Sequence, residues 1–564
     1  MIKDLDTTTF HTRAAAELET RQTPSAILDT AHRSDIRGAL GTIREHDAAP
    51  RATWRSRLLT LLVVMGPGLI VMVGDNDAGG VATYAQAGQN YGTTLLWVLF
   101  LLIPVLIVNQ EMVVRLGVTT GVGHARLIIE RFGRFWGAFS VGDLFILNFL
   151  TIMTEFIGVS LSLGYFGVSQ FISVPIAAVV LVAVTVTGSF RRWERAMYLC
   201  VAANFLAIPL AFLSHPKAGL VAHDFFVPQL QGGVNSTILL LIIALVGTTV
   251  APWQLFFQQS NVIDKRITPR FYRYEFADTC IGAVVVIVIV GAAALMIATA
   301  FAFQGTALVG QFSDAGTAAA QLGQKVGAAS GAILAICLLN ASIIGASAVT
   351  LASSYAFGDV FKVAHSLHRS WKEGWAFHLA YSLQVVFAAG LVLLSNSAIQ
   401  GLVTTGVQAL AGILLPSATV FLLLLCNDKA VLGPRVNKPW LNAVATVIVG
   451  ILVMLSLILA STTLFPSWDV RPLVAGLSGV LIVGLAITGA LYLRNRGRRA
   501  LAAARAPTQD PMSWRMPPLS TLPKARWSAV QTVGMVTLRG YLLVAVALLV
   551  FRVVQLALTG GHGG

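Results

Sequence analysis

Charged residues are scarce in this 564-residue chain, where they make up 11% of the sequence. Soluble domains carry about 25% charged residues, so the composition excludes an ordinary soluble protein. Cysteine is also rare. The four cysteines lie far apart in apolar stretches and form no CxxC pair, which excludes a secreted disulfide framework and leaves apolar filling as their expected role.

Motifs for catalysis and export are absent as well. The sequence contains no HExxH motif, no nucleotide-binding loop and nothing that resembles a nucleophile–base pair, so we expect neither an enzyme nor a bound cofactor. Residues 1–56 are polar, mixed in charge and without an apolar core. We therefore expect a cytosolic N-terminal tail of low order there, and no cleaved signal peptide.

Long apolar runs fill most of the remaining chain, which is 56% hydrophobic overall. A helix needs about 20 apolar residues to cross a bilayer. The sequence therefore predicts an all-α polytopic membrane protein with spans near residues 58–88, 94–116, 136–166, 172–189, 195–213, 236–260, 278–304, 326–358, 374–395, 398–426, 438–462 and 471–493. A thirteenth candidate, 538–558, contains Arg552, which costs about 2.5–3.5 kcal/mol at a helix centre. This segment is expected to span, to lie in the interface or to pack on the rest.

The net charge is +14. In a soluble chain this excess would indicate a nucleic-acid partner. Here the basic residues gather in alternate loops between the predicted spans, as the positive-inside rule requires. We expect no nucleic-acid partner, a lipid bilayer around the spans, and a multi-pass protein of the plasma (inner) membrane with its N-terminus in the cytosol.

The first predicted span is interrupted by the sequence GDNDAGG, residues 74–80. Asp75 and Asp77 are ionisable groups at a depth where such groups are costly and are seldom kept without a task. Gly79 and Gly80 favour unwound backbone, which is tolerated there only where it lines a cavity or is buried in protein. The pattern indicates a cation site. The alternative is a carboxylate pair that only caps the second half-helix.

A second interruption lies in the span predicted at 236–260, which contains the sequence GTTVAPWQ. Pro252 removes a backbone donor in mid-span and frees carbonyl groups, while Gly247, Thr248 and Thr249 add flexibility and hydroxyl groups. Interruptions in spans one and six, five spans apart, indicate inverted repeats around a central site. An ordinary proline kink is the alternative for this helix taken alone.

Two further polar residues stand out inside predicted spans. Glu155 lies in the sequence TEFIG of span three, and Gln408 lies in span ten. Small and hydroxyl residues, such as those of span eight, usually serve helix packing. A buried carboxylate and a buried amide are less easily explained by packing, so Glu155 and Gln408 are candidates for a role at the central site.

The order and spacing of these features resemble the NRAMP divalent-metal transporters, across about residues 57–495. The matching motifs are GPG at 66–68, DAGG at 77–80 in place of the family's DPGN, NQEMVVRLG ending at Gly117, TEFIG with Glu155, TTVAPWQ in place of ATVMPHN, Gln408 at the helix-ten glutamine and NDKAVLG at 427–433. The resemblance implies a LeuT-like fold of two inverted five-helix repeats plus extra C-terminal helices, which moves divalent cations by alternating access. It divides the chain into the tail, a transporter domain at 57–495, a cytosolic basic, Pro-rich linker at 496–537 and the thirteenth candidate.

Several positions depart from the family pattern. The metal-binding aspartate matches Asp77, but its asparagine partner is Gly80 and the metal-binding methionine of helix six is Ala251. The histidine linked to proton movement is Trp253, and the helix-three aspartate is Ile152. The arginine pair of the same proton route has no clear equivalent. Compared with the family pattern, this chain therefore keeps the metal-binding carboxylate and lacks the residues of the proton route.

Loss of the methionine sulfur leaves a site of oxygen ligands, to which Asp75 and Asn76 can add. Ala251 and Gly80 are also expected to leave more room than the family's residues. Mg²⁺ prefers oxygen ligands and keeps several waters, and the pattern resembles the NRAMP-related magnesium transporters, a divergent branch that also lacks the methionine. We therefore predict Mg²⁺ as the transported cation, with Mn²⁺ as a second substrate, and transport that is not coupled to protons. The predicted metal-site residues are Asp77, Gly80, Ala251, Asp75, Asn76 and Gln408, and the predicted gating or coupling residues are Glu155, Trp253, Pro252 and Gly79.

Two other functions stay open at this point. A proton-coupled Mn²⁺/Fe²⁺ importer like the main NRAMP family would show transport that depends on pH. A Na⁺-coupled organic-solute symporter on the same fold would hold a substrate carboxylate at the helix breaks. The two acidic residues at the first break argue against that second alternative.

Overall fold

The computed structural model describes residues 27, 29–465, 467–504, 510–511 and 514–525, together with residues 532, 536, 540 and 543. The first 26 residues and nearly all of the thirteenth candidate, 538–558, lie outside the described residues. The structure therefore does not test the prediction for residues 538–558.

The described chain is almost entirely helical, apart from one short hairpin. Its first half comprises η1 (Thr30–His32), β1 (Ile36–Gly38), β2 (Gly41–Ile43), α2 (Trp54–Val64), α3 (Pro67–Gly74), α4 (Ala78–Tyr91), α5 (Leu96–Thr120), α6 (His124–Phe132), α7 (Arg134–Tyr165), α8 (Gln170–Thr185), α9 (Phe190–Asn204), α10 (Ala207–Leu213), α11 (Ala218–Phe226), α12 (Ser236–Thr249) and α13 (Pro252–Asp264). Its second half comprises η2 (Pro269–Phe271), α14 (Tyr272–Ile281), the π-helical η3 (Gly282–Ala292), α15 (Ala293–Phe303), α16 (Ala315–Lys325), α17 (Ala328–Phe361), α18 (Trp375–Leu394), α19 (Ser397–Cys426), α20 (Lys429–Leu432), η4 (Gly433–Arg435), α21 (Pro439–Leu464), α22 (Val470–Ala504) and η5 (Leu519–Thr521).

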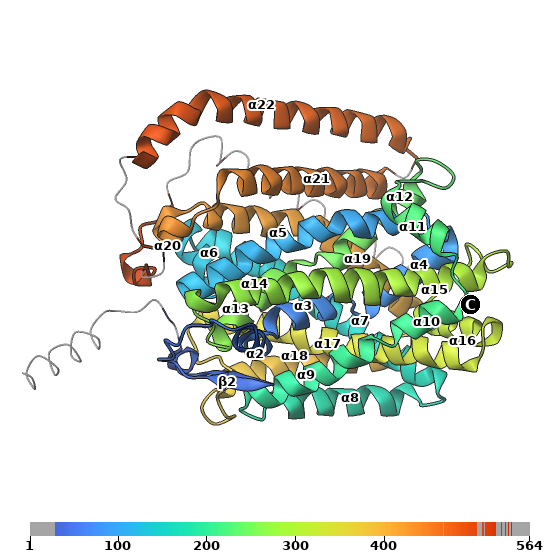
Figure 1. The fold of residues 1–564 in the computed structure, drawn as a ribbon. Coiled ribbons are helices and arrows are strands. Elements are labelled where there is room, and N and C mark those ends of the chain that lie inside the picture. The colour runs from blue at the N-terminus through green and yellow to red at the C-terminus, as the bar shows by residue number, and fades with distance from the viewer. Residues whose placement is uncertain are drawn as a thin grey trace, which may run out of the picture.

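The helices form a bundle whose long axes run side by side, across the view in Figure 1. α17 is its central element and packs against α7, α13, α16, α18 and α9. α22 lies along the upper edge of the view and packs mainly on α21. The exposed side chains of α22 are largely apolar, as expected for a helix whose surroundings are lipid.

Nine helical segments of the described chain are long and apolar enough to cross a membrane, or ten if α2 and α3 are counted as one span bent by 51°. Each of the twelve predicted spans overlaps at least one of the helices given above. Five of them are not single helices of spanning length. The spans at 58–88, 195–213, 236–260 and 278–304 are each divided among two or three helices, and α8, in the span at 172–189, has 16 residues. The prediction of an all-α polytopic membrane protein is confirmed.

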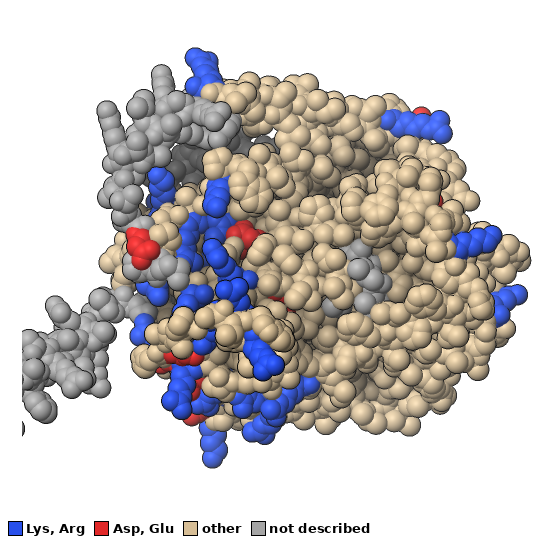
Figure 2. Space-filling view, viewed as in Figure 1, with Lys and Arg blue, Asp and Glu red and all other residues tan. Residues whose placement is uncertain are grey.

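Basic side chains gather at one end of the bundle, the left end in Figure 2. In Figure 1 this end carries β2 and α20, while α16 lies at the other end. We call the first the basic end and the second the opposite end. The basic end includes the start of α9 and the loops at 265–271 and 362–374. The basic loops therefore lie together at one end of the folded molecule, as the positive-inside rule predicts.

The first predicted span is broken twice, where one break was expected. Besides the break at 75–77, the chain turns at Met65 and Gly66 between α2 and α3. Gly66 has φ +150°, a backbone conformation that side chains rarely adopt. The carboxylate of Asp278 on α14 accepts the N–H groups of Gly66 at 2.9 Å and Gly68 at 2.8 Å, so it satisfies the positive end of α3.

The prediction of a tail of low order is wrong for its second half. β1 and β2 pair in antiparallel register, with Ile36 opposite Ile43. Both isoleucines are buried in a small core with Val64 and Val262, at the end of α2 and in α13. The hydrophobic contacts explain the order, because an isolated two-stranded hairpin is only marginally stable unless it packs against something.

Candidate functional site

The break between α3 and α4 brings its two carboxylates into different roles. Asp77 is the N-cap of α4, and its Oδ1 accepts the Gly80 N–H at 2.6 Å. Asp75 instead ends α3, and both its oxygens are buried without a hydrogen-bond donor among the described residues. The capping interpretation therefore holds for Asp77 and fails for Asp75. An unsatisfied carboxylate at this depth needs a cation or a proton.

The second break is an unwound stretch of two residues. α12 ends at Thr249 and α13 begins at Pro252, and between them Ala251 has the extended angles φ −85°, ψ 146°. The side-chain amide of Gln254 donates to the freed carbonyl of Thr249 at 3.3 Å. Gln254 in turn accepts the amide of Gln110 on α5 at 2.9 Å. The prediction of a broken helix is confirmed, and Gln254 is a supporting residue that the sequence analysis missed.

The two breaks meet at Gly80. A Cβ atom on Gly80 would lie 3.0 Å from the carbonyl oxygen of Asp75, 3.1 Å from Thr248 Oγ1 and 3.3 Å from Asp77 Oδ1. Three oxygens from both broken helices therefore face the bare Cα of one glycine. The expectation that Gly80 leaves open room is wrong, because these three oxygens closely surround the position of the missing side chain. The expectation of an oxygen-lined site agrees with the arrangement.

Tyr84 joins the two broken helices on another side. Its hydroxyl lies 3.1 Å from Thr249 Oγ1, so α4 and the end of α12 share a buried hydrogen bond. α3 and α12 both end at the breaks, and the C-terminal end of a helix carries a partial negative charge. Two such ends, with Asp75 and Asp77 beside them, favour a positive ion.

Gln408 of α19 reaches the first break. A Cβ atom on Gly79 would overlap the side-chain amide of Gln408, and it would lie 3.4 Å from Asp77 Oδ1. Gly79 is therefore the residue that allows α19 to approach the site. Gln408 is 4% exposed, and its Nε2 atom has no acceptor in the part of the chain described. A spare amide beside Asp77 is available to a ligand.

Glu155 of α7 approaches from the other side of the same turn. Its Oε2 accepts the N–H of Ala78, the residue after Asp77, at 3.1 Å. Its carboxylate also lies against Gly345 of α17, where a Cβ atom would be 2.7 Å from the carboxyl carbon. Glu155 thus links the first turn of α4 to the central helix.

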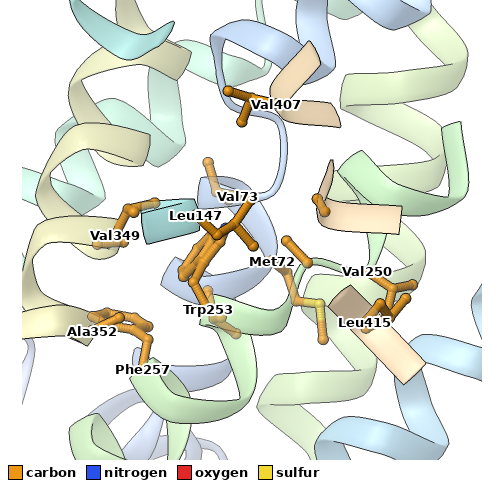
Figure 3. Close-up of a cluster of buried hydrophobic side chains, with 14 of the residues drawn as sticks. Met72, Val73, Leu147, Val250, Trp253, Phe257, Val349, Ala352, Val407 and Leu415 are labelled. Carbon is orange, nitrogen blue, oxygen red and sulfur yellow. The ribbon is translucent and has the colours of Figure 1, made fainter. Parts of the chain in front are cut away.

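Two predicted site residues point elsewhere. Asn76 packs against Gly291 of η3, where any side chain at 291 would overlap its amide, so it does not join the oxygens around Gly80. Trp253 lies in an apolar cluster with Met72, Val73 and Phe257 (Figure 3). Its ring is 5.9 Å from that of Phe257, centroid to centroid.

This apolar cluster and a cavity lie on opposite sides of the site. Trp253 and Phe257 follow the second break toward the basic end, because α13 runs from Pro252 to the basic loop at 265. A cavity of about 310 Å³ begins at Gly79 and Gln408 and continues along Thr404, Gln400 and Asp314 toward the opposite end. The site is therefore reached from the opposite end and sealed by aromatic side chains toward the basic end.

The described residues contain no group of three or more His, Cys, Asp or Glu side chains placed to hold a resident metal ion. The arrangement around Gly80 differs from such a site, because backbone carbonyl and hydroxyl oxygens supplement the carboxylates.

Comparisons with known proteins agree with this arrangement. The profile of the family described as Natural resistance-associated macrophage protein-like (Nramp) matches residues 68–462. The chain is 27% identical over 423 residues to the divalent metal cation transporter MntH of Bacillus subtilis, covering 72% of this chain and 93% of that protein. It is 28% identical over 438 residues to the protein of the same name from Xanthomonas campestris, covering 74% and 94%.

Solved structures show the same fold. A manganese transporter of Eremococcus coleocola matches with a TM-score of 0.61 at 20% identity, over 82% of this chain and 98% of that chain. The expected LeuT-like architecture, with extra helices after the two repeats, is confirmed. From the family profile and the two broken helices together, this chain belongs to the Nramp family.

Proposed function

We propose that this protein moves divalent cations across a membrane by alternating access, with the cation bound at Asp77. The observation that carries the proposal is the convergence of Asp75 O, Thr248 Oγ1 and Asp77 Oδ1 beside Gly80. These oxygens come from two unwound helices and lie at the end of a cavity. The unsatisfied carboxylate of Asp75 adds negative charge close by. Such a site attracts a small, highly charged cation.

We further propose Mg²⁺ as the preferred cation, with Mn²⁺ also carried. Ala251 supplies no sulfur at the second break, so the ligands around Gly80 are oxygens alone. Oxygen ligands suit Mg²⁺ and Mn²⁺, whereas thioether sulfur favours softer metals. Gln400 and Asp314, two polar residues of the cavity lining, are proposed as partners for the waters that Mg²⁺ retains.

The proposed orientation places the basic end in the cytosol of a cell whose plasma membrane the bundle spans. Basic loops remain on the cytosolic side during insertion, and they are gathered at one end of this molecule. The cavity at the opposite end then faces outward. In this proposed orientation the molecule faces outward, and import requires that the basic end open in its turn.

We propose that transport is not coupled to protons. Trp253 and Ile152 are buried apolar side chains, and neither exchanges a proton. A second candidate is a proton-coupled manganese importer. It is favoured by the names of the relatives, a divalent metal cation transporter and a manganese transporter, and by Glu155, a buried carboxylate in contact with the turn that follows Asp77.

The test is cation uptake into proteoliposomes that contain the full chain. Asp77→Asn keeps a side chain that can cap α4 and removes the charge, so folding should be retained while saturable Mg²⁺ and Mn²⁺ uptake is lost. Asp469→Asn is the matched control, because Asp469 also accepts a backbone N–H, that of Arg471 at the start of α22, and lies exposed outside the cavity. A pH-sensitive dye trapped inside distinguishes the two candidates. Its signal should not change during uncoupled transport. In a proton-coupled importer, the dye should report an acidification that scales with cation uptake. Unchanged uptake in Asp77→Asn would refute the proposed site.

A further inference from the structure

Residues 29–43, which we call the N-terminal strap, lie across the basic end of the bundle. The strap comprises η1 and the β1–β2 hairpin. Nothing in its sequence resembles a transport motif, yet much of it is buried, including Asp29 at 3% and Ala39 at 3% exposure. Its contacts fall into two groups, one at each end of the strap.

The first end is held by the loop between α17 and α18. Arg369 donates to both carboxylate oxygens of Asp29, with the shortest distance 2.5 Å. The backbone N–H of His365 donates to Asp29 at 2.8 Å. His32 Nε2 donates to the carbonyl oxygen of His365 at 3.1 Å. Arg266, just after α13, donates to the Ala31 carbonyl at 2.8 Å.

The hairpin end is held by α9 and a buried ion pair. Arg191 donates to the Gly38 carbonyl at 3.1 Å, and the Ala39 N–H donates to Glu194. The same Glu194 carboxylate is 2.5 Å from Lys265 Nζ, and both side chains are fully buried. Lys265 also donates to the carbonyl oxygen of Met65, at the hinge between α2 and α3.

The strap therefore bonds to the start of α9 and to the segments that follow α13 and α17, and through Glu194 and Lys265 it is linked to the hinge at which α3 begins. α3 and α13 are the halves of the two broken helices that lie between the site and the basic end. For the site to open there, these helices must move away from the ends of α9 and α17. A segment bonded to the ends of α9, α13 and α17, and linked to α3 through Lys265, opposes that movement. Charge-assisted hydrogen bonds, as at Asp29 and Glu194, are the stronger kind.

We propose that the N-terminal strap is a latch, which holds the basic end closed and must detach before a cation can leave on that side. This proposal rests on the proposed transport function for its consequence. The closure itself is a property of the fold. Detachment requires breaking the Asp29–Arg369 pair and withdrawing Ala39 from Glu194, so these contacts set how readily the basic end opens.

The latch is tested in the full chain with Asp29→Asn and Arg369→Gln, which break one ion pair from its two sides. Arg33→Gln is the control, because Arg33 lies on the strap with an exposed side chain.

Hydrogen exchange of the amides of residues 36–43 reports whether the strap is docked. Ser260→Cys, introduced into each variant, reports opening, because Ser260 is buried and lines a small space against the strap residue His32. The parent chain without this cysteine gives the background from the native thiols.

We expect both variants to exchange their strap amides faster. The thiol introduced at position 260 should be labelled from the basic end about tenfold faster, the scale set by loss of one charge-assisted hydrogen bond. Arg33→Gln should match the parent.

Faster strap exchange with unchanged labelling would overturn the latch, because detachment would not open this end. Unchanged strap exchange would also overturn it, because the pair would not hold the strap. Labelling is measured without any divalent cation, so it decides the latch even if uptake assays refute the proposed function.

Discussion

Glycine at position 80 determines which atoms surround the proposed cation. With a side chain there, the Thr248 hydroxyl and the Asp75 carbonyl could not approach as closely as they do. The family's asparagine would supply one oxygen at the end of a side chain, whereas this chain supplies oxygens from two other residues. The substitution therefore exchanges a side-chain ligand for a hydroxyl and a backbone carbonyl.

Thr248 is the residue on which this exchange can be tested. Thr248→Val keeps the shape and removes the hydroxyl, so we expect the half-saturating Mg²⁺ concentration for uptake to rise by about tenfold or more, since a bond to a charged partner contributes about 1.5–3 kcal/mol. Thr248→Ser keeps the hydroxyl and should stay close to the parent. Concentration-dependent uptake in proteoliposomes provides the measurement. Equal half-saturation in the valine and serine variants would remove Thr248 from the site.

His32 gives the strap a dependence on pH. Burial lowers the pKa of His32, the positive charge of His365 lowers it further, and Asp264, Asp29 and Asp359 only partly oppose this. A free strap would titrate near the ordinary value of about 6.5. Because the docked histidine is the poorer proton acceptor, docking is strongest above that value and weakens as pH falls below it.

Hydrogen exchange of residues 36–43 at pH 7.5 and pH 5.5, corrected for the intrinsic exchange rate, should show this weakening. His365 acts in the opposite direction. Burial lowers its pKa, but the hydrogen bond to Asp359 and charges that include Asp29 raise it above the ordinary value. His32→Gln retains a donor for the His365 carbonyl and removes only the protonation of residue 32. In this variant, the docking of the strap should therefore no longer weaken as the pH falls. Equal weakening in both proteins would exclude His32 as the cause.

At the scale of whole helices, α3 is held between a close backbone contact and a hinge. A Cβ atom on Gly68 would lie 2.6 Å from the backbone nitrogen of Thr279 on α14. Backbone cannot yield as a flexible side chain can, so Gly68→Ala should push α3 away from α14. We expect it to lower stability by about 1–3 kcal/mol, the usual range for overpacking.

Thermal unfolding in detergent measures this effect. Gly219→Ala is the matched control, because Gly219 lies in the helix α11 with no atom within 4 Å of the added carbon. The control should be neutral or slightly stabilising, since alanine is the better helix former. An unfolding midpoint for Gly68→Ala equal to that of the control would show that α3 moves freely against α14.

Both helix breaks can be predicted from sequence because their causes are neighbours in the chain. Gly, Asp and Pro act on the backbone where they stand, so Asp77, Gly79 and Pro252 mark the breaks directly. The approach of Thr248 to Gly80 and the turn of Asn76 toward η3 depend on how separate helices pack. A single sequence carries no local signal for those pairings. Gln408 stands out in the sequence as an amide inside a predicted span, and the resemblance assigns it to the site; its contact with Gly79 agrees with that assignment.

The strap shows the same limit more strongly. Asp29 and Arg369 are 340 positions apart in sequence, and Ala39 and Glu194 are 155 apart. The polar composition of residues 1–56 is typical of a flexible tail. Its order comes from buried isoleucines and from backbone groups bonded to distant side chains. The composition of a segment indicates whether it is ordered in isolation, whereas the strap is ordered by its contacts with the rest of the bundle.

For the whole molecule, the clearest feature is that one end is open and the other closed. Thr404 is half-buried and lines the cavity, while Ser260 lies beneath the strap. In cells, Thr404→Cys should react with a membrane-impermeant thiol reagent added outside, and Ser260→Cys in an otherwise unchanged chain should react slowly. Labelling of Thr404→Cys only from inside would reverse the proposed orientation. Slow labelling from both sides would show that the cavity is closed in the membrane.

The position of the strap at the start of the chain has a consequence for biosynthesis. Its partner Arg369 is made 340 residues after Asp29, which at about 5–20 residues per second corresponds to about 17–70 s of translation. During that time the strap has no complete surface to bind. It docks only after α17 and the loop that follows have left the ribosome. An incomplete chain, truncated before Arg369, therefore keeps its strap exposed to proteases, and docking marks a bundle that has been built through α17.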